Sequence, residues 1–146
     1  MVRRDLQFQL GNAGAGVISI SATLAAHGAH AIHRAREIRR DAFVATGNQI
    51  IDGTPIKTGL ARGNWQTSIG EAITTPIMVR PADEAKRELA AIADEATGDQ
   101  TLVFANNAAH IVRLEYGWSA QAPEGMLRLA LLRWDQNVTE AENKNR

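Results

Sequence analysis

The spacing of small and apolar residues after position 20 constrains this chain most, because it predicts one long helix. The residues recur at intervals of three and four, which places them on one face of a helix. They are Leu24, Gly28, Ala31, Ala35, Ile38, Ala42 and Ala45. Ser21 is a suitable N-cap, and the Asp52-Gly53-Thr54-Pro55 sequence ends the helix near Ile51. The opposite, polar face carries His30, His33, Arg34, Glu37, Arg40 and Asp41.

The sequence after this helix predicts short strands alternating with shorter helices. Strands are expected at 64–69, 76–80 and 101–105, and helices at 81–98, at 108–116 and from Pro123 onward. The middle helix should bury Ala85, Leu89, Ile92 and Ala96, and the last helix Leu127, Leu131, Trp134, Val138 and Ala141. The expected fold class is α+β, with a small antiparallel sheet packed by the long N-terminal helix, a middle helix and a C-terminal helix.

Residues 1–20 differ from the rest of the chain. Two β-leaning pieces, 6–10 and 17–20, flank a glycine-rich run at 11–16, and the first alternates apolar and polar residues as a half-buried strand does. We expect either a hairpin or an extended arm that reaches a neighbour. Residues 21–146 should form a single α+β domain.

The composition excludes several classes of protein. The chain has 146 residues, which suits one domain, and its 16 Lys and Arg residues balance 16 Asp and Glu residues. A free nucleic-acid-binding protein usually has a basic excess, which is absent here. The sequence has no cysteine, no secretory leader pattern and no apolar run of about 20 residues that could span a membrane. We expect a protein made and used in a cytoplasm, which could leave the cell inside a larger particle.

Candidate catalytic and cofactor sites are weak. His27, His30 and His33 have a helical spacing that suits a metal, but no carboxylate lies among them, so no metal site is expected. The glycine run lacks the spacing of a phosphate-binding loop. His110 and Glu115 could lie near each other, and Ser119 follows Trp118, yet no nucleophile motif surrounds that serine. The sequence therefore predicts neither an enzyme nor a cofactor.

Four arginines on the long helix keep one alternative open. Arg34, Arg36, Arg39 and Arg40 could contact a phosphate backbone, although Glu37 and Asp41 interrupt the patch. A solvated face, or a ring lined with mixed charge, suits this pattern better than a DNA groove. A nucleic-acid-binding module remains the alternative from a different class of protein.

The 106–126 segment points to assembly. Tyr116 and Trp118 flank Gly117 in a piece of chain too short to be a core element, and Pro123 follows a polar run. Aromatic residues in a loop held by glycine and proline are typical of a surface that another subunit covers.

Two segments together resemble one family. Residues 54–66, Thr-Pro-Ile-Lys-Thr-Gly-Leu-Ala-Arg-Gly-Asn-Trp-Gln, resemble the Thr-Pro-Val-Asp-Thr-Gly-x-x-Arg-x-x-Trp motif of neck and tail-completion proteins of long-tailed bacteriophages, which include the minor tail protein Z of phage lambda. Asn106-Asn107, residues 114–119 and residues 121–126 resemble that family's second motif. The chain departs from the family at Lys57, where Asp is usual, and at Ala109-His110-Ile111, where Pro-Tyr-Ala is usual.

The resemblance implies a structural protein of a siphovirus virion. It would form a ring, expected to be sixfold, at the neck or top of the tail, complete the tail and allow head–tail joining. Its partners would be other copies of itself and neighbouring neck and tail proteins, with DNA passing through the lumen without sequence-specific contact and no membrane involved. A tail terminator ring is the nearest alternative. The residues expected at the subunit or partner interface are Arg62, Trp65, Glu115, Tyr116, Trp118, Ser119, Gln121 and Pro123.

Overall fold

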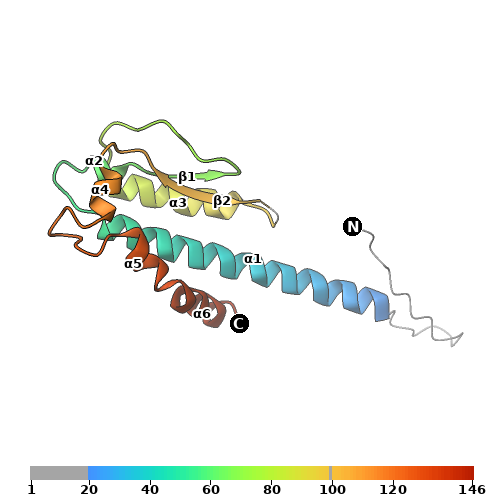
Figure 1. Ribbon diagram of the computed structural model, residues 1–146. Helices are drawn as coiled ribbons and strands as arrows, with labels where there is room; N and C mark the ends of the chain where they lie inside the picture. The colour runs from blue at the N-terminus through green and yellow to red at the C-terminus, as the bar shows by residue number, and fades with distance from the viewer. Residues whose placement is uncertain (1–19, 99) are drawn as a thin grey trace, which may run out of the picture. The chain divides into compact units, whose positions relative to one another are not determined.

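A computed structural model describes residues 20–98 and 100–146, with side chains from His27 onward (Figure 1). Within those residues the chain forms six helices and one two-stranded antiparallel sheet, so the predicted α+β class is confirmed. The described residues divide into two units, with the boundary between Ala35 and Arg36. The predicted strand at 6–10 and the glycine run lie outside the described residues.

Helix α1 (Ile20–Gly53) confirms the predicted long helix but corrects its buried stripe. In the first unit every described side chain, 27–35, is exposed, including Ala31 and Ala35, for which the spacing predicts burial. In the second unit the helix does have a buried face, formed by Ala42, Thr46, Gly47, Ile50 and Ile51. The helical period continues along the whole element, but a period alone does not show which turns another element covers.

The second unit is built around the C-terminal half of α1. The sheet and α3 (Ala82–Glu95) lie on one side of this half, and α5 (Leu127–Leu131) and α6 (Trp134–Lys144) lie on the other (Figure 1). Leu89 of α3 packs so closely against Gly47 that a Cβ on the glycine would lie 2.5 Å from the leucine Cδ2. Phe43 meets Phe104 edge to face, with ring centroids 6.3 Å apart. The core therefore has α1 at its centre.

The sheet has two strands rather than the predicted three. Strands β1 (Trp65–Ile69) and β2 (Leu102–Asn106) pair antiparallel, close to the predicted strands at 64–69 and 101–105. The predicted strand at 76–80 is wrong. The side-chain amide of Asn64 bonds both the N–H and the C=O of Ile77, at 2.8 and 2.9 Å, and so takes the place of a backbone ladder.

Side chains bond part of the outer edge of β1, where a third strand would have to pair. Arg80 donates through Nη2 to the Trp65 carbonyl oxygen at 2.7 Å, and Glu88 Oε1 accepts from the Thr67 N–H at 2.9 Å. These two side chains also form an ion pair at 2.9 Å. Burial opposes ionisation of Glu88, but the bonds from Arg80 and Thr67 outweigh it and lower the pKa of that carboxyl.

The C-terminal region differs from the predicted single helix. Helices α5 and α6 are separate, and the predicted stripe is wrong at Leu127 and Leu131, which are exposed. Ala130 and Asn137, which lie outside the predicted stripe, are buried, and Ala141 is buried as predicted. Asn137 can occupy a buried position because Thr46 and Gln49 of α1 satisfy its amide, at 2.8 to 3.1 Å. A stripe chosen by apolar character alone therefore misplaces the buried face of α5 and misses the buried polar residue of α6.

Two leucines give a direct test of this packing. Leu89 has 0% of its surface exposed, whereas Leu131 has 53% exposed. Leu89→Ala should lower the free energy of unfolding by about 2–5 kcal/mol, because it leaves a cavity between α1 and α3. Leu131→Ala removes the same atoms from a solvated site and should change the free energy of unfolding by less than about 1 kcal/mol. If urea unfolding gave the same loss of free energy of unfolding for both variants, the described core would be contradicted.

Candidate functional site

The two segments that carry the family resemblance meet in the structure. The side-chain amide of Gln121 pairs with the backbone of Ile56: its Oε1 accepts from the Ile56 N–H at 3.0 Å, and its Nε2 donates to the Ile56 carbonyl oxygen at 3.0 Å. Asn106 adds a second link through Nδ2 to the Ala61 carbonyl oxygen at 2.7 Å. Residues 65 positions apart are thus joined through the same kind of bond pair that joins two strands.

The first segment is anchored to the end of α1 through Thr54. Its hydroxyl donates to the Ile50 carbonyl oxygen at 2.7 Å and accepts from Trp65 Nε1 at 2.8 Å. Arg62 donates to the Thr54 and Asp52 carbonyl oxygens at 2.8 and 2.9 Å, which satisfies acceptors left free where a helix ends. The loop after α1 is therefore fixed by side chains from α2 (Leu60–Gly63) and β1.

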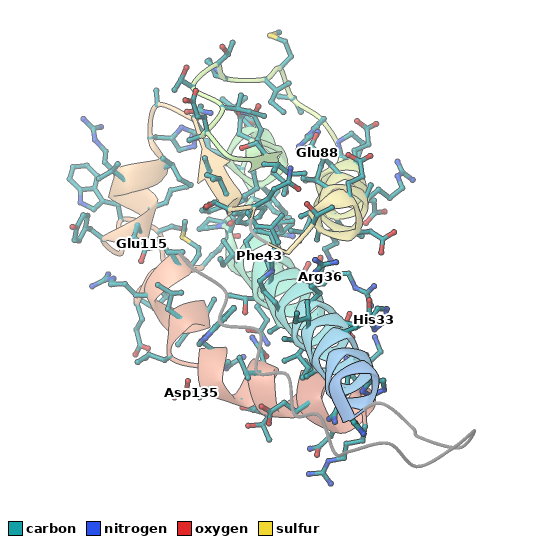
Figure 2. The ribbon with its side chains drawn as sticks, turned by 90° about the vertical axis from the view of Figure 1, so that its right-hand side faces the viewer. His33, Arg36, Phe43, Glu88, Glu115 and Asp135 are labelled. Atoms are coloured by element: carbon teal, nitrogen blue, oxygen red, sulfur yellow. The ribbon has the colours of Figure 1, made fainter. Side chains whose placement is uncertain are left out.

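Glu115 anchors the second segment. It is the last residue of α4 (Ile111–Glu115), and its carboxylate accepts the backbone N–H groups of Met126, Leu127 and Arg128 at 2.9 to 3.0 Å. Figure 2 shows Glu115 at the junction of α4 and α5. Burial raises the pKa of this carboxyl, but the three N–H donors and the Arg128 side chain outweigh burial and lower it. A charged carboxylate thus caps the start of α5.

Two glycines let the segment turn tightly. Gly117 and Gly125 both have φ +84°, which favours glycine. Gly117 ends α4 with bonds from its own N–H to Leu114 and from the Trp118 N–H to Arg113. A Cβ on Gly117 would collide with the Pro123 carbonyl oxygen, so the backbone at both ends of the 117–123 loop is closely packed. The loop is held in one shape.

This loop and the residue before it present two exposed aromatic side chains. Trp118 is 72% exposed and Tyr116 is 69% exposed. Arg113 lies over the Trp118 ring at 4.9 Å and Arg128 over the Tyr116 ring at 5.3 Å, so each ring is held by a cation on the protein's own surface. Large rings with restricted rotamers lose little entropy on binding, which is the property of an interface anchor.

A groove runs beside Trp118. It has a volume of about 450 Å³ and lies between the loop after α1 and the 118–121 loop. Its walls combine apolar Pro55, Leu60 and Leu114 with polar Lys57 and His110. The groove joins the two resemblance segments into one continuous surface.

The predicted interface residues fall into two groups. Tyr116, Trp118, Gln121 and Pro123 are exposed, and Ser119 is half-buried, with its Oγ accepting from the Gln121 N–H at 3.2 Å. Arg62, Trp65 and Glu115 bond the loops through their side chains. Trp65 is only 5% exposed and stacks on Phe104, with ring centroids 4.8 Å apart. Trp65 is therefore buried rather than at a surface, and Arg62 and Glu115 bond the chain's own backbone, while the interface role of the other five stays a prediction.

Sequence reasoning missed the polar residues that build this surface. Thr54 and Asn64 are fully buried, and Asn106 turns the chain by accepting from the Ala108 N–H. Each is a short polar side chain beside Pro, Gly or another Asn, which is the available signal for a side chain that bonds backbone locally.

The arginine patch on α1 is partly occupied by internal contacts. Arg39 donates to the carbonyl oxygens of Thr97, Gly98 and Gln100 at 3.0 to 3.3 Å. Arg40 pairs with Glu37, Asp41 and Asp94 at 2.9 to 3.2 Å. These contacts disfavour a phosphate-binding role for both residues.

Comparison with known proteins leaves the function to be inferred from the motifs and the geometry. No protein-family model, curated protein or solved structure matches the chain. Among the described residues, no group of three or more His, Asp or Glu side chains is placed to share a metal ion, and no helix is long and apolar enough to cross a membrane. The absence of enzymatic activity and of a cofactor stays a prediction.

The Glu115 cap makes a prediction about acid stability. Since the pKa of Glu115 in the folded chain lies below its ordinary value of 4.5, its charged form stabilises the fold fully above that pH. This contribution is lost as the pH falls through the folded pKa. Glu115→Gln should therefore lower the free energy of unfolding at pH 7 by on the order of 1 kcal/mol, with the deficit shrinking toward pH 3.

Chemical unfolding at a series of pH values would measure this difference. The control is Glu124→Gln, at a neighbouring exposed glutamate. Its free energy of unfolding should equal that of the unsubstituted chain at each pH. A deficit in Glu115→Gln that stays constant from pH 7 to pH 3 would contradict the charged cap.

Proposed function

We propose that this chain is a structural protein of a bacteriophage virion that forms a ring at the neck or top of the tail. The ring would complete the tail and allow it to join a DNA-filled head. It would bind copies of itself and adjacent neck and tail proteins, and DNA would pass through its lumen without sequence-specific contact. The location would be the virion, after assembly in the host cytoplasm.

The observation that carries this proposal is the Gln121–Ile56 pairing. It joins the two segments on which the family resemblance rests into one surface, and that surface presents Tyr116 and Trp118. A family resemblance in separate segments is more specific when both segments form one site. The rigid loop and its exposed aromatic side chains support an assembly role. Each subunit of a circular assembly makes the same contact with the next subunit, and a preformed surface suits such a contact.

The tail terminator ring remains the nearest rival. Both rings would use a rigid surface of this size, so the surface does not separate them. The nucleic-acid-binding alternative is less well supported, because Arg39 and Arg40 are engaged within the chain and the net charge is zero.

Phage genetics tests the function directly. In a phage that encodes this chain, a stop codon early in its gene should give filled heads and tails of normal length that fail to join, or that join into non-infectious particles. Electron microscopy of the lysate would show which products form, and supplying the chain from a plasmid should restore infectious particles.

The same experiment separates the rivals. Tails of uncontrolled length would identify a terminator and reject tail completion. Normal infectious particles would reject both ring functions.

Two tryptophans test the surface. Trp118→Ala should keep the circular dichroism and melting temperature of the isolated chain but fail to enter particles, because truncating an interface anchor typically costs about 2 kcal/mol or more of association free energy. Trp65→Ala is the matched control: it should lower the free energy of unfolding by about 3–5 kcal/mol, since Trp65 is buried. Unfolding of Trp118→Ala would make Trp118 a core residue, and its normal entry into particles would remove it from the interface.

A further inference from the structure

The two edges of the sheet differ, and the difference points to a binding site. In an antiparallel pair, alternate residues direct their N–H and C=O groups toward the partner strand or away from it. The Gly70 N–H donates to the Thr101 carbonyl oxygen, which makes these two a hydrogen-bonded pair. By alternation, Thr67 and its partner Phe104 both direct their backbone groups outward, to opposite edges.

On the outer edge of β1 side chains bond two backbone groups, whereas on the outer edge of β2 the described residues form no such bonds. On β1, Glu88 accepts the outward Thr67 N–H and Arg80 donates to the outward Trp65 carbonyl oxygen. On β2, the same alternation means that the N–H and C=O groups of Leu102 and Phe104 point outward. No hydrogen bond to any of these four groups is formed by residues 20–98 or 100–146. An unpaired strand edge binds an extended segment by backbone hydrogen bonds.

An apolar groove lies beside this open edge. It has a volume of about 340 Å³, with Trp65, Phe104 and Met126 among the lining residues from the core and Val112 and Tyr116 from α4 and its end. Val112 is 63% exposed. A strand added to β2 would direct alternate side chains toward the same face of the sheet as Phe104, and therefore into the groove. The occupant needs apolar residues at every second position.

The chain itself contains a segment of this kind. Leu6-Gln7-Phe8-Gln9-Leu10 alternates strictly, with three apolar residues on one side and two uncharged glutamines on the other, and it has the five-residue length of β2. Residues 11–19 separate it from α1 and can span at most about 30 Å when extended.

We propose that residues 6–10 of one copy add a third strand to the open β2 edge of a neighbouring copy. Leu6, Phe8 and Leu10 would face the groove, and the outward backbone groups of Leu102 and Phe104 would bond the added strand. The choice of a neighbouring copy rests on the proposed ring, because an arm and a separate edge form the head-to-tail contact that closes one.

Hydrogen exchange on the full chain tests this strand addition. As the protein concentration rises and the chain assembles, the Leu102 and Phe104 amides should exchange at least about tenfold more slowly, with the assembly mass followed by light scattering. Phe8→Asp should abolish both changes, because it places a charge in the groove. Gln7→Asp adds the same charge on the other side of the segment and should keep both changes.

A second pair of variants tests the receiving edge. Val112→Asp should prevent assembly, while Val79→Asp, at another exposed valine, should not. Assembly and amide protection unchanged by both Phe8→Asp and Val112→Asp would overturn the proposal, and so would protection independent of protein concentration.

These measurements use isolated protein, so they can fail separately from the proposed function. If assembly occurs without protection of Leu102 and Phe104, only the strand addition is wrong. If the strand adds as described but the phage genetics shows no head–tail or tail-length defect, the neck function is wrong.

Discussion

The hydroxyl of Thr54 is the contact on which the candidate surface depends. It ends α1 by bonding back to Ile50 and fixes Trp65 through the indole N–H, while Arg62 holds the carbonyl oxygen of the same residue. These bonds decide the direction in which the chain leaves α1 and therefore where Ile56 lies. Only with Ile56 in that place can Gln121 pair with it. A buried polar group with every partner in place specifies one geometry more strictly than apolar packing does.

Much of the fold could be predicted from local sequence, and the errors concern what lies against each element. The long helix, the middle helix opened by Pro81 and two of three strands follow from periodicity and from proline and glycine positions. One failure occurs where a side chain takes the place of an expected strand, and others where residues predicted to be buried, in α1 before Arg36 and in α5, are exposed. Asn64 takes the place of a strand at 76–80, and Asn137 is a buried polar residue that lies outside the apolar stripe. Periodicity describes an element and does not identify what covers it.

The residues of the candidate surface could be predicted from the sequence, but which of them are exposed and which make contacts within the chain could not. Tyr116 and Trp118 follow from their place in a glycine-framed loop. Whether Glu115 faces a partner or caps α5, and whether Trp65 is a platform or core, depends on contacts between residues distant in sequence. Nothing in the local pattern encodes those contacts, because both roles use the same residue types.

The cap that Glu115 provides has a consequence for how this region tolerates change in length. Glu115 is the last residue of α4 and its carboxylate binds the start of α5, so the ten residues between them form a closed loop anchored on a single side chain. Gly117 and Pro123 then pack against each other across the loop. An inserted residue would have to release either the carboxylate or that backbone contact. Related chains should therefore differ in the identity of the exposed residues between positions 116 and 125 while keeping their number.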